Sequence, residues 1–486
     1  MSNLRVLFVT PEAYPVMKTG GLGDVSGALP SALHQAGVDA RLLLPGYPAV
    51  LQQTHSEDTG IHLALFPGIN ALLRLGTMPD SHLPVYVLDC PGLYQREGNP
   101  YTDANGQDWP DNALRFAALS KAAALMGTEG IRDQIGFIPQ IIHCNDWQTG
   151  LTPAYQRYLP GEHPHIIMSI HNMAYQGLFP ADMLTTLDLP EDSLHVYGLE
   201  YYGQISFLKA GLYYADWVTT VSPTYAEEIQ GPEFGYGMEG LLGSRQKQLT
   251  GLINGIDYQQ WNPATDNYLW ETYDADSLDK KASNTRALRQ QLKLNESDQP
   301  LIGIVTRLTH QKGIDMVIAA LPDIIHEGAQ FAILGSGDLA LEKLLAGLAE
   351  RYPGQVSFTQ GYHEALSHQI EAGADMFLMP SRFEPCGLNQ LYSMAYGTIP
   401  IVRHTGGLAD TVIPVTPTTL DTGTATGFLF DEKSPQALFD CVDNALVTYR
   451  NPDLWRQLQI NGMKRDFSWH RSAQSYIELY RLFTEE

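Results

Sequence analysis

The sequence predicts an α/β protein of two doubly wound domains, each a parallel sheet covered by helices. Short aliphatic and β-branched runs alternate with segments long enough for a helix, as expected for strands buried on both faces. The 486 residues exceed what one hydrophobic core normally organises. The hexapeptide Thr-Gly-Gly-Leu-Gly/Ala-Asp occurs once in each half, at Thr19–Asp24 and Thr405–Asp410. Two such turns indicate two nucleotide-fold domains that face each other across a cleft.

Each expected element follows from a local run of residues. In the first half, apolar runs predict strands at Arg5–Val9, Ala40–Leu44, Val85–Asp89, Ile141–Cys144, Ile166–Ile170 and Val218–Val221. In the second half, they predict strands at Leu301–Val305, Gln330–Leu334, Val356–Thr359, Met376–Met379 and Ile399–Val402. The expected helices include Asp24–Gln35, Asn112–Leu125, Asp315–Ala320, Leu339–Arg351, Leu388–Tyr396 and Ser472–Phe483. A polar stretch after Gly251–Asp257 places the domain boundary there, between residues 1–250 and 251–465.

Composition narrows the class of function. The formal net charge of −24 disfavours binding to nucleic acid or to an anionic membrane, which needs clustered lysine and arginine. No stretch approaches the roughly 20 apolar residues of a membrane span. The four cysteines are scattered without a Cys-x-x-Cys pair, which fits a reducing compartment and disfavours a structural zinc site. We therefore expect a cytoplasmic protein.

The first hexapeptide copy carries a lysine. Lys18 precedes Gly20 and Gly21 in a loop that follows the first expected strand. Paired glycines let a backbone approach a ligand, and the start of a helix offers free N–H groups to an anion. A lone loop lysine is usually a solvated charge, but this context favours phosphate binding. The turn is neither a Walker A loop nor a Gly-x-Gly-x-x-Gly motif, so a dehydrogenase is not supported.

Two cations follow the first strand of the second domain. Arg307 and Lys312 come just after Leu301–Val305, at the carboxyl end where open α/β sheets bind ligands. Two cations can neutralise a diphosphate, and the arginine fork can make bidentate contacts. An acidic protein that binds an anionic ligand needs such local cations.

A strand-to-helix turn at residues 380–390 is the next candidate. Glu384 is placed to accept hydrogen bonds from sugar hydroxyls, and the N–H groups of Gly387 and Leu388 open the following helix. Cys386 has no evident base partner, so we expect a buried or site-lining thiol rather than a nucleophile.

Two strand ends in the first half carry groups suited to a sugar. His171 ends one strand, where its ring or its backbone carbonyl could serve. Asp146 and Trp147 follow another and supply a carboxylate and an aromatic plate. The sequence has no evident metal-binding cluster and no Asp-x-Asp motif.

Four segments resemble those of bacterial glycogen synthases and the related plant starch synthases. They are residues 18–22 (Lys-Thr-Gly-Gly-Leu), 171–177 (His-Asn-Met-Ala-Tyr-Gln-Gly), 307–313 (Arg-Leu, then Gln-Lys-Gly) and 384–388 (Glu-Pro-Cys-Gly-Leu). The likeness runs from Val6 to Trp469 in the family's order and spacing, and the lack of a transit peptide before Leu4 favours the bacterial type. It implies a GT-B fold, with two Rossmann-like domains facing across a cleft, the donor held mainly by the second, and C-terminal helix 466–486 packed on the first.

The resemblance also implies a reaction and a set of site residues. Glucose would pass from ADP-glucose to the non-reducing end of an α-1,4-glucan (glycogen), with retention and with no metal or other cofactor. Catalytic roles are implied for Lys18, His171, Arg307, Lys312 and Glu384. Donor contacts are implied for Lys18, Gly20, Gly21, Asn254, Arg307, Lys312, Tyr362, Glu384, Cys386, Gly387, Leu388, Thr405 and Gly406, and the glucose and acceptor side for Tyr101, Asp146, Trp147 and His171.

One departure bears on the mechanism. Many retaining transferases of this fold carry a second glutamate eight residues after the first, where this chain has Tyr392. No carboxylate is clearly placed as a nucleophile, so we expect front-face attack with the donor phosphate as base, and a covalent double displacement is the alternative. Two alternative functions are another nucleotide-sugar transferase, for example one using UDP-glucose, and a non-catalytic glucan-binding protein.

Overall fold

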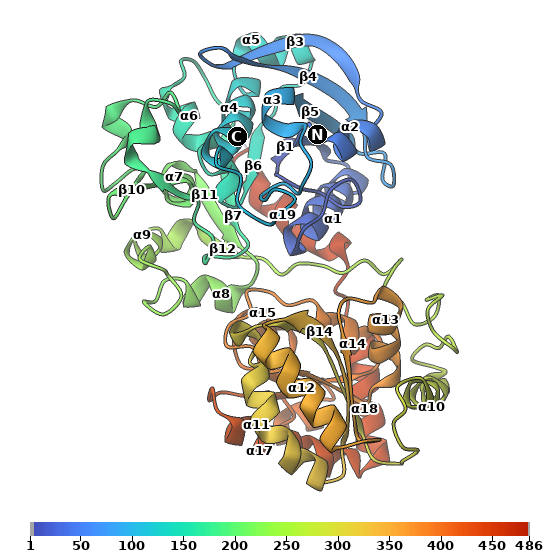
Figure 1. Ribbon diagram of the computed structural model, residues 1–486. Helices are drawn as coiled ribbons and strands as arrows, with labels where there is room; N and C mark the ends of the chain where they lie inside the picture. Colours follow the sequence, from blue (N-terminus) through green and yellow to red (C-terminus); the bar gives the residue numbers. More distant parts are fainter. Residues whose placement is uncertain (1–3, 485–486) are drawn as a thin grey trace. The chain divides into compact units, whose positions relative to one another are not determined.

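The computed structural model describes residues 4–484, which divide into two compact units. The first unit combines the chain up to Val221, Ala226–Gly255 and the part from Trp469 onward. The second comprises Ser222–Tyr225 and Ile256–Ser468. Each unit has a large, mainly parallel sheet, so the predicted two-domain α/β class is confirmed (Figure 1).

The first unit contains a nine-stranded sheet in the order β12-β11-β7-β6-β1-β2-β5-β4-β3. Strand β1 is parallel to β2 and β6, with Val6 opposite Ala40 on one side and Ile141 on the other. Strand β4 alone is antiparallel to its neighbours β3 and β5, so the other eight strands of this sheet run in one direction. The strands are β1 (Arg5–Val9), β2 (Asp39–Pro45), β3 (Glu57–Phe66), β4 (Ile69–Thr77), β5 (Pro84–Asp89), β6 (Ile141–Asn145), β7 (His165–Ile170), β11 (Trp217–Thr220) and β12 (Leu249–Gly251).

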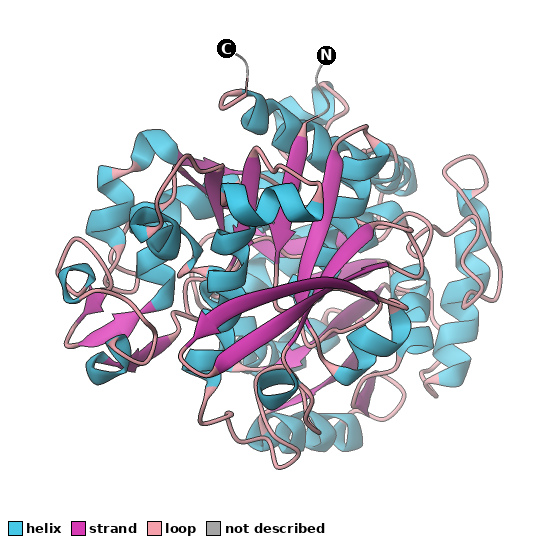
Figure 2. Ribbon diagram, turned by 90° about the horizontal axis from the view of Figure 1, so that it is seen from above, coloured by secondary structure: helices cyan, strands magenta, loops and turns pink. Residues whose placement is uncertain are grey.

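Helices cover this sheet because its central strands are apolar on both faces. Val6–Val9 of β1 have no exposed surface, and helices lie around the strands (Figure 2). A second, three-stranded sheet has the order β8-β10-β9, from β8 (Leu178–Pro180), β9 (Glu200–Tyr201) and β10 (Gln204–Ser206). The helices are α1 (Gly21–Gln35), α2 (Pro48–Gln53), α3 (Pro91–Tyr94), α4 (Asn112–Met126), α5 (Glu129–Ile135), α6 (Thr152–Tyr158), α7 (Phe207–Tyr214), α9 (Glu239–Ser244) and α19 (Trp469–Arg481); α8 (Pro223–Glu228) has residues in both units.

The C-terminal helix α19 is held in the first unit by a buried histidine. His143 of β6 lies 2.6 Å from the Tyr480 hydroxyl through Nδ1 and 2.6 Å from Ser169 Oγ through Nε2. Burial lowers the pKa of His143 to about 3, so the ring is neutral in its apolar surroundings. Tyr476 and Tyr480 of α19 are buried, so both rings serve packing.

The second unit has a six-stranded parallel sheet in the order β15-β14-β13-β16-β17-β18. Its strands are β13 (Leu301–Leu308), β14 (Gln330–Gly337), β15 (Val356–Gln360), β16 (Met376–Met379), β17 (Ile399–Arg403) and β18 (Phe428–Phe430). Its helices are α10 (Lys281–Gln291), α11 (Ile314–His326), α12 (Leu339–Arg351), α13 (Glu364–Gly373), α14 (Asn389–Ala395), α15 (Gly406–Thr411), α16 (Pro417–Asp421), α17 (Pro435–Tyr449) and α18 (Pro452–Met463).

Alternate residues of the second sheet enter two different cores. Ile302 and Ile304 of β13 pack in one core with α11, α12 and α17. Leu301 and Val305 of the same strand pack in another core with α10 and α13. This period-two alternation of apolar residues explains why the strands read as continuous hydrophobic runs in the sequence.

Both sheets reverse their strand order beside the first strand of the unit. In the first unit the chain runs outward from β1 through β2 to β5, and then from β6 in the opposite direction. In the second unit the reversal lies between β13 and β16. Open α/β sheets bind ligands outside the carboxyl ends of the strands at such a reversal. The loops after β1, β6, β13 and β16 are therefore where a site is expected.

Several elements differ from the sequence prediction. The β3–β4 hairpin, the three-stranded sheet, β12 and β18 were not expected. Helix α1 begins at Gly21 rather than Asp24. The prediction placed its start too late because the first turn contains glycines, which have a low helix propensity. Helix α11 continues through Pro322 to His326, because Leu321, Ile324 and Ile325 on either side of the proline are held in the core.

Candidate active site

The loop after β1 is organised by a buried carboxylate that the sequence prediction missed. Glu12 Oε2 accepts hydrogen bonds from the backbone N–H of Thr19 at 2.5 Å and from the Thr19 hydroxyl at 2.8 Å. Glu12 Oε1 accepts one from the Tyr101 hydroxyl at 2.9 Å. Burial raises the pKa of Glu12, although the bonds from Thr19 oppose the shift. Tyr101, predicted on the acceptor side, thus supports the lysine loop through Glu12.

Lys18 and its glycines lie at the start of α1. The ammonium of Lys18 pairs with Asp24 at 2.7 Å, and the Lys18 side chain is 43% exposed. A Cβ built on Gly20 or Gly21 would have no atom within 4 Å. The space beside the two glycines is open, and within residues 4–484 no side chain caps the N-terminus of the fifteen-residue helix α1. This geometry suits an anionic ligand.

The loop after β6 holds Asp146 in a strained conformation. Its φ is 56°, a region that non-glycine residues rarely adopt, and its side chain is buried. Asp146 Oδ1 accepts a hydrogen bond from the backbone N–H of His171 at 2.7 Å. Burial raises the pKa of the Asp146 carboxyl to about 7, and the charge of nearby Glu12 acts in the same direction. The loops after β1, β6 and β7 therefore meet at the strand reversal of the first unit.

The ring of His171 already has a partner. Its Nε2 lies 3.0 Å from Asn145 Oδ1. Burial lowers the pKa of His171 to about 4, so the ring is neutral near pH 7. A neutral, hydrogen-bonded ring favours the backbone carbonyl over the ring as the group that His171 offers to a substrate.

Trp147 and Asn254 have contrasting surroundings. The Trp147 ring lies edge-on to Phe116 at 4.9 Å, and a Cβ at Gly177 would come within 2.3 Å of it. The indole thus packs against protein on these sides. Asn254 is buried, and its Oδ1 has no hydrogen-bond partner among the described residues. An unsatisfied buried acceptor of this kind is uncommon and is typical of a ligand contact.

In the second unit, some of the expected site residues line a cavity of about 180 Å³, whereas Tyr362, Cys386, Thr405 and Gly406 do not. It lies at the carboxyl ends of β13 and β16, where the strand order reverses. Arg307 is exposed there and, within residues 4–484, forms no ion pair. The cavity brings together five residues that the sequence predicted, namely Arg307, Lys312, Glu384, Gly387 and Leu388.

Lys312 and Glu384 form a largely buried ion pair in this cavity. Lys312 Nζ lies 2.5 Å from Glu384 Oε2, and the two side chains are 16% and 9% exposed. The Ser381 hydroxyl donates to the same oxygen at 2.9 Å. Ser381 was not predicted, because a serine between a strand and a helix has many structural uses. Each partner fixes the position of the other, so a ligand meets a preorganised cation and carboxylate.

The second hexapeptide copy packs directly on the Glu384 turn. A Cβ at Gly406 would lie 2.0 Å from the Glu384 carbonyl oxygen, and one at Gly407 would lie 2.1 Å from that of Cys386. Gly406 has a φ of 44°, in the left-handed region. Thr405 and Cys386 are both buried. These glycines allow two backbone segments to touch.

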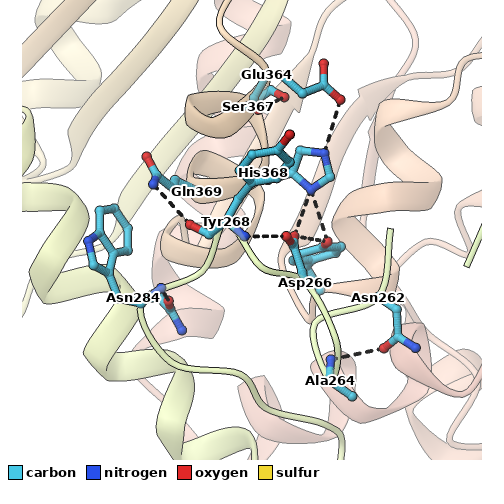
Figure 3. Close-up of polar contacts among 11 residues, drawn as sticks. Asn262, Ala264, Asp266, Tyr268, Asn284, Glu364, Ser367, His368 and Gln369 are labelled. Atoms are coloured by element: carbon cyan, nitrogen blue, oxygen red, sulfur yellow. Dashed lines mark hydrogen bonds and ion pairs between the residues drawn. The ribbon is translucent and has the colours of Figure 1, made fainter. Parts of the chain in front are cut away.

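Tyr362 stands apart from that cavity and is 73% exposed. Its hydroxyl donates to Glu364, whose other oxygen lies 3.3 Å from His368 Nε2. His368 Nδ1 in turn lies 2.7 Å from Asp266 Oδ2 (Figure 3). Burial alone would raise the pKa of Asp266, but the bonds from His368 and Tyr396 lower it below its usual value. Tyr362 is thus linked to a buried polar network.

Tyr392, the residue in place of a second glutamate, has a packing role. Its ring stacks on Trp261 with centroids 3.8 Å apart, and the other face of Trp261 stacks on His368 at the same distance. A charged carboxylate would not fit this stack. The departure from a two-glutamate pattern therefore has a structural reason.

Within residues 4–484, no group of three or more His, Cys, Asp or Glu side chains could hold a metal ion. Over the same part of the chain, no helix is long and apolar enough to cross a membrane.

Comparisons with known proteins cover the whole chain. Residues 5–244 match the family model described as "Starch synthase catalytic domain", and residues 284–463 match "Glycosyl transferases group 1". The glycogen synthases of Nitrosomonas eutropha and Nitrosospira multiformis are 50% and 48% identical to this chain, covering 100% and 98% of it and 97% of each relative. The solved catalytic domain of starch synthase IV from Arabidopsis thaliana, bound to ADP and acarbose, has a TM-score of 0.87 at 33% identity and 100% coverage of both chains.

Proposed function

Because this chain belongs to the glycogen synthase family of glycosyltransferases, we propose that it transfers glucose from ADP-glucose to the non-reducing end of an α-1,4-glucan. The ADP in the Arabidopsis starch synthase structure supports an adenine nucleotide as the carrier of the sugar. Four buried cysteines without disulfides, together with the family, support action in the cytoplasm.

The observation that carries the proposal is the cavity beside β13. It presents Arg307, free of an ion pair within residues 4–484, and Lys312, held by Glu384. Two cations at the carboxyl end of a strand can hold the diphosphate of a nucleotide sugar. They also neutralise the charge that develops on ADP as the sugar–phosphate bond breaks, which is the main electrostatic task in this reaction.

The remaining second-unit residues would contact the sugar and the base. Glu384 uses Oε2 for Lys312 and Ser381, which leaves Oε1 to accept a bond from a glucose hydroxyl. The N–H groups of Gly387 and Leu388 line the same cavity. Exposed Tyr362 would stack near the adenine, and Cys386, Thr405 and Gly406 would support donor groups through their backbone.

The first unit would supply Lys18, with Gly20 and Gly21, to the donor phosphates and Asn254 Oδ1 to a donor hydroxyl. Asp146, Trp147, His171 and, through Glu12, Tyr101 would serve the glucose and acceptor side. The neutral His171 ring leaves its backbone carbonyl as the group beside the anomeric carbon.

For the chemical step we propose front-face attack. The acceptor hydroxyl forms the new bond on the face from which ADP leaves, and a donor phosphate oxygen takes its proton. The configuration of the anomeric carbon is thereby retained without a protein nucleophile. Trapping of a covalent glucosyl-enzyme would refute this step.

One assay tests the function. Labelled ADP-glucose and UDP-glucose are offered in parallel, with and without glycogen, and label in the polymer is counted. We expect transfer from ADP-glucose that requires glycogen. Preferential use of UDP-glucose would replace the donor assignment, and the absence of transfer from either donor would refute the function.

Two variants test whether Arg307 and Lys312 in the cavity beside β13 bind the donor. Arg307→Ala and Lys312→Ala should each lower kcat/KM for ADP-glucose by about 100-fold or more, because each removes a charge from the leaving group. Arg286→Ala, an exposed arginine on α10, is the matched control and should retain wild-type activity. Wild-type activity in Arg307→Ala would remove that residue from the site.

A further inference from the structure

The first unit exposes a cluster of four tyrosines that neither the fold nor the proposed chemistry requires. Tyr202 is 80% exposed, Tyr175 is 56% exposed and Tyr236 is 37% exposed. The ring of Tyr201 lies edge-on to that of Tyr202, with centroids 4.8 Å apart. Tyr175, Tyr201, Tyr202 and Tyr236, from three separate segments, are called the tyrosine cluster below.

Contacts between the segments join the cluster into one surface. The Tyr201 hydroxyl donates to the backbone carbonyl of Tyr236, and Gln176 Nε2 donates to the same oxygen at 3.0 Å. A Cβ at Gly237 would lie 2.8 Å from the Tyr201 hydroxyl and 3.2 Å from Tyr202 Cε2. Burial, and then the neighbouring Tyr175, raise the pKa of Tyr236. The rings are therefore held side by side.

Two of these tyrosines occupy backbone positions that disfavour a bulky residue. Tyr202 and Gly203 have φ of 47° and 82° and join β9 to β10 as a two-residue hairpin loop. Tyr236 and Gly237 have φ of 49° and 78°, in a turn closed by a 2.8 Å bond from Met238 N–H to the Gly235 carbonyl. Such turns need positive φ at both central residues and are normally built with Asn, Asp or Gly at the first.

Tyrosine in these turns raises the free energy of the folded state for two reasons, the backbone conformation and the exposure of the ring. A left-handed backbone is unfavourable for a bulky residue, and an exposed ring gains little from burial. An asparagine would make either turn at lower cost. The ring of Tyr202, which is 80% exposed, gains little from burial to offset this cost, and use as a contact surface would account for its place in the turn.

The chemistry of the surface selects a neutral sugar polymer. Tyrosine offers a flat apolar face and a hydroxyl, with few rotatable bonds to immobilise. The neighbouring charges include two carboxylates and one ammonium. Glu200 accepts a hydrogen bond from Gly203 N–H at 2.8 Å, and burial and the charge of Glu239 both raise the pKa of Tyr201. The ammonium of Lys209 donates to the Glu200 backbone carbonyl, so the two carboxylates outnumber it. The carboxylates disfavour an anionic polymer. Tyr175 and Gln176 also belong to the loop that begins at His171, so the cluster continues from the proposed acceptor side.

We propose that the tyrosine cluster is a holding surface for an α-1,4-glucan chain, on which glucose rings stack while the enzyme extends the polymer. The choice of glucan rests on the proposed function. The surface increases the affinity for long chains and takes no part in the bond-making step.

Affinity electrophoresis of the full chain tests this surface. Native gels are run with increasing glycogen and no donor, so binding is measured independently of turnover. Tyr202→Asn and Tyr236→Asn remove one ring each but suit the left-handed turn, so both should fold with a Tm at or above that of the wild type. Each should raise the dissociation constant for glycogen at least fivefold, whereas Tyr202→Phe, which keeps the ring, should stay within twofold.

His82→Asn is the matched control, because His82 has a φ of 56° in the same unit but lies outside the cluster. It should relieve a strained turn without changing glycogen affinity. Glycogen affinities of both Tyr→Asn variants within twofold of the wild type would overturn the proposal. A loss in Tyr202→Phe as large as in Tyr202→Asn would overturn the stacking role. Failure of the ADP-glucose assay alone would refute the proposed function and leave this binding result standing as a separate measurement.

Discussion

The two copies of the hexapeptide have nearly the same sequence but different surroundings. In the first, a Cβ on Gly20 or Gly21 would meet no atom within 4 Å. In the second, a Cβ on Gly407 would lie 2.1 Å from the Cys386 carbonyl oxygen. Asp24 pairs with Lys18, whereas Asp410 accepts hydrogen bonds from the backbone and hydroxyl of Thr224, each at 2.8 Å.

This difference shows that the same motif can have two structural roles. In the first copy, glycine keeps the surface beside a helix N-terminus open, so a ligand can approach the backbone. In the second copy, glycine lets one backbone segment support another, the turn that carries Glu384. Substitutions in the first copy should therefore mainly lower activity, and substitutions in the second copy should mainly lower stability.

The largest effect is expected for the lysine of the first copy. Lys18→Ala should lower kcat/KM for ADP-glucose by about 100- to 1000-fold, because the proposed role of this cation is to neutralise the leaving diphosphate. Its exposed pair with Asp24 contributes at most about 1 kcal/mol, so urea unfolding should change little.

The preceding residue in the second copy, His404, supplies the matched control. It is 54% exposed and pairs with Asp431 instead of facing the 180 Å³ cavity. His404→Ala should keep activity within about threefold of the wild type, a loss below 1 kcal/mol. Equal losses in Lys18→Ala and His404→Ala would break the distinction between the copies.

The next effect concerns stability. Gly407→Ala places a methyl group against the Cys386 backbone and should lower the free energy of unfolding by about 3 kcal/mol. Urea unfolding followed by fluorescence measures the change. Wild-type stability in this variant would show that the two segments are not in firm contact.

A third effect comes from buried carboxylates, whose surroundings differ between the two units. Glu384 is paired with Lys312, whereas Asp146 forms no ion pair within residues 4–484. Because burial raises the pKa of Asp146 to about 7, the folded state keeps a proton that the unfolded state releases above pH 4. Its contribution to stability is thus full below about pH 4 and is lost as the pH rises towards 7.

Asp146→Asn should remove this pH dependence. The variant should be more stable than the wild type by about 2 kcal/mol at pH 8, because an amide avoids the buried charge but accepts fewer hydrogen bonds. The two proteins should converge near pH 4. Thermal unfolding across this range measures the difference, and a constant gap at all pH values would contradict the assignment.

The smallest effect is expected at the open glycines. Gly20 has an extended backbone that any residue adopts, so Gly20→Ala should change stability by less than about 0.5 kcal/mol. If the donor phosphates bind beside Gly20 as proposed, the added methyl group would obstruct them and should reduce kcat/KM about tenfold. Gly347→Ala, also without a neighbour within 4 Å, should leave activity unchanged.

Much of the fold could be predicted because its strands are local apolar runs. The runs at Arg5–Val9 and Leu301–Val305 identified the first strand of each sheet. The β3–β4 hairpin escaped prediction because its outer strand is half exposed and mixes charged with apolar residues. Part of the site escaped for a related reason. Glu12 and Ser381 act on groups that only the fold brings near them, so nothing beside them in the sequence reveals a role.

The sequence alone determined the two-domain α/β class and the family, and it indicated candidate residues at the ends of several strands. These features depend on short runs and local motifs, which a linear chain displays directly. The tertiary structure alone decided which glycine pair faces open space and which supports a turn, that Asp146 is buried without a cation, and that two left-handed tyrosines share one surface. Burial and close approach are properties of neighbours distant in the chain, so only the folded molecule contains them.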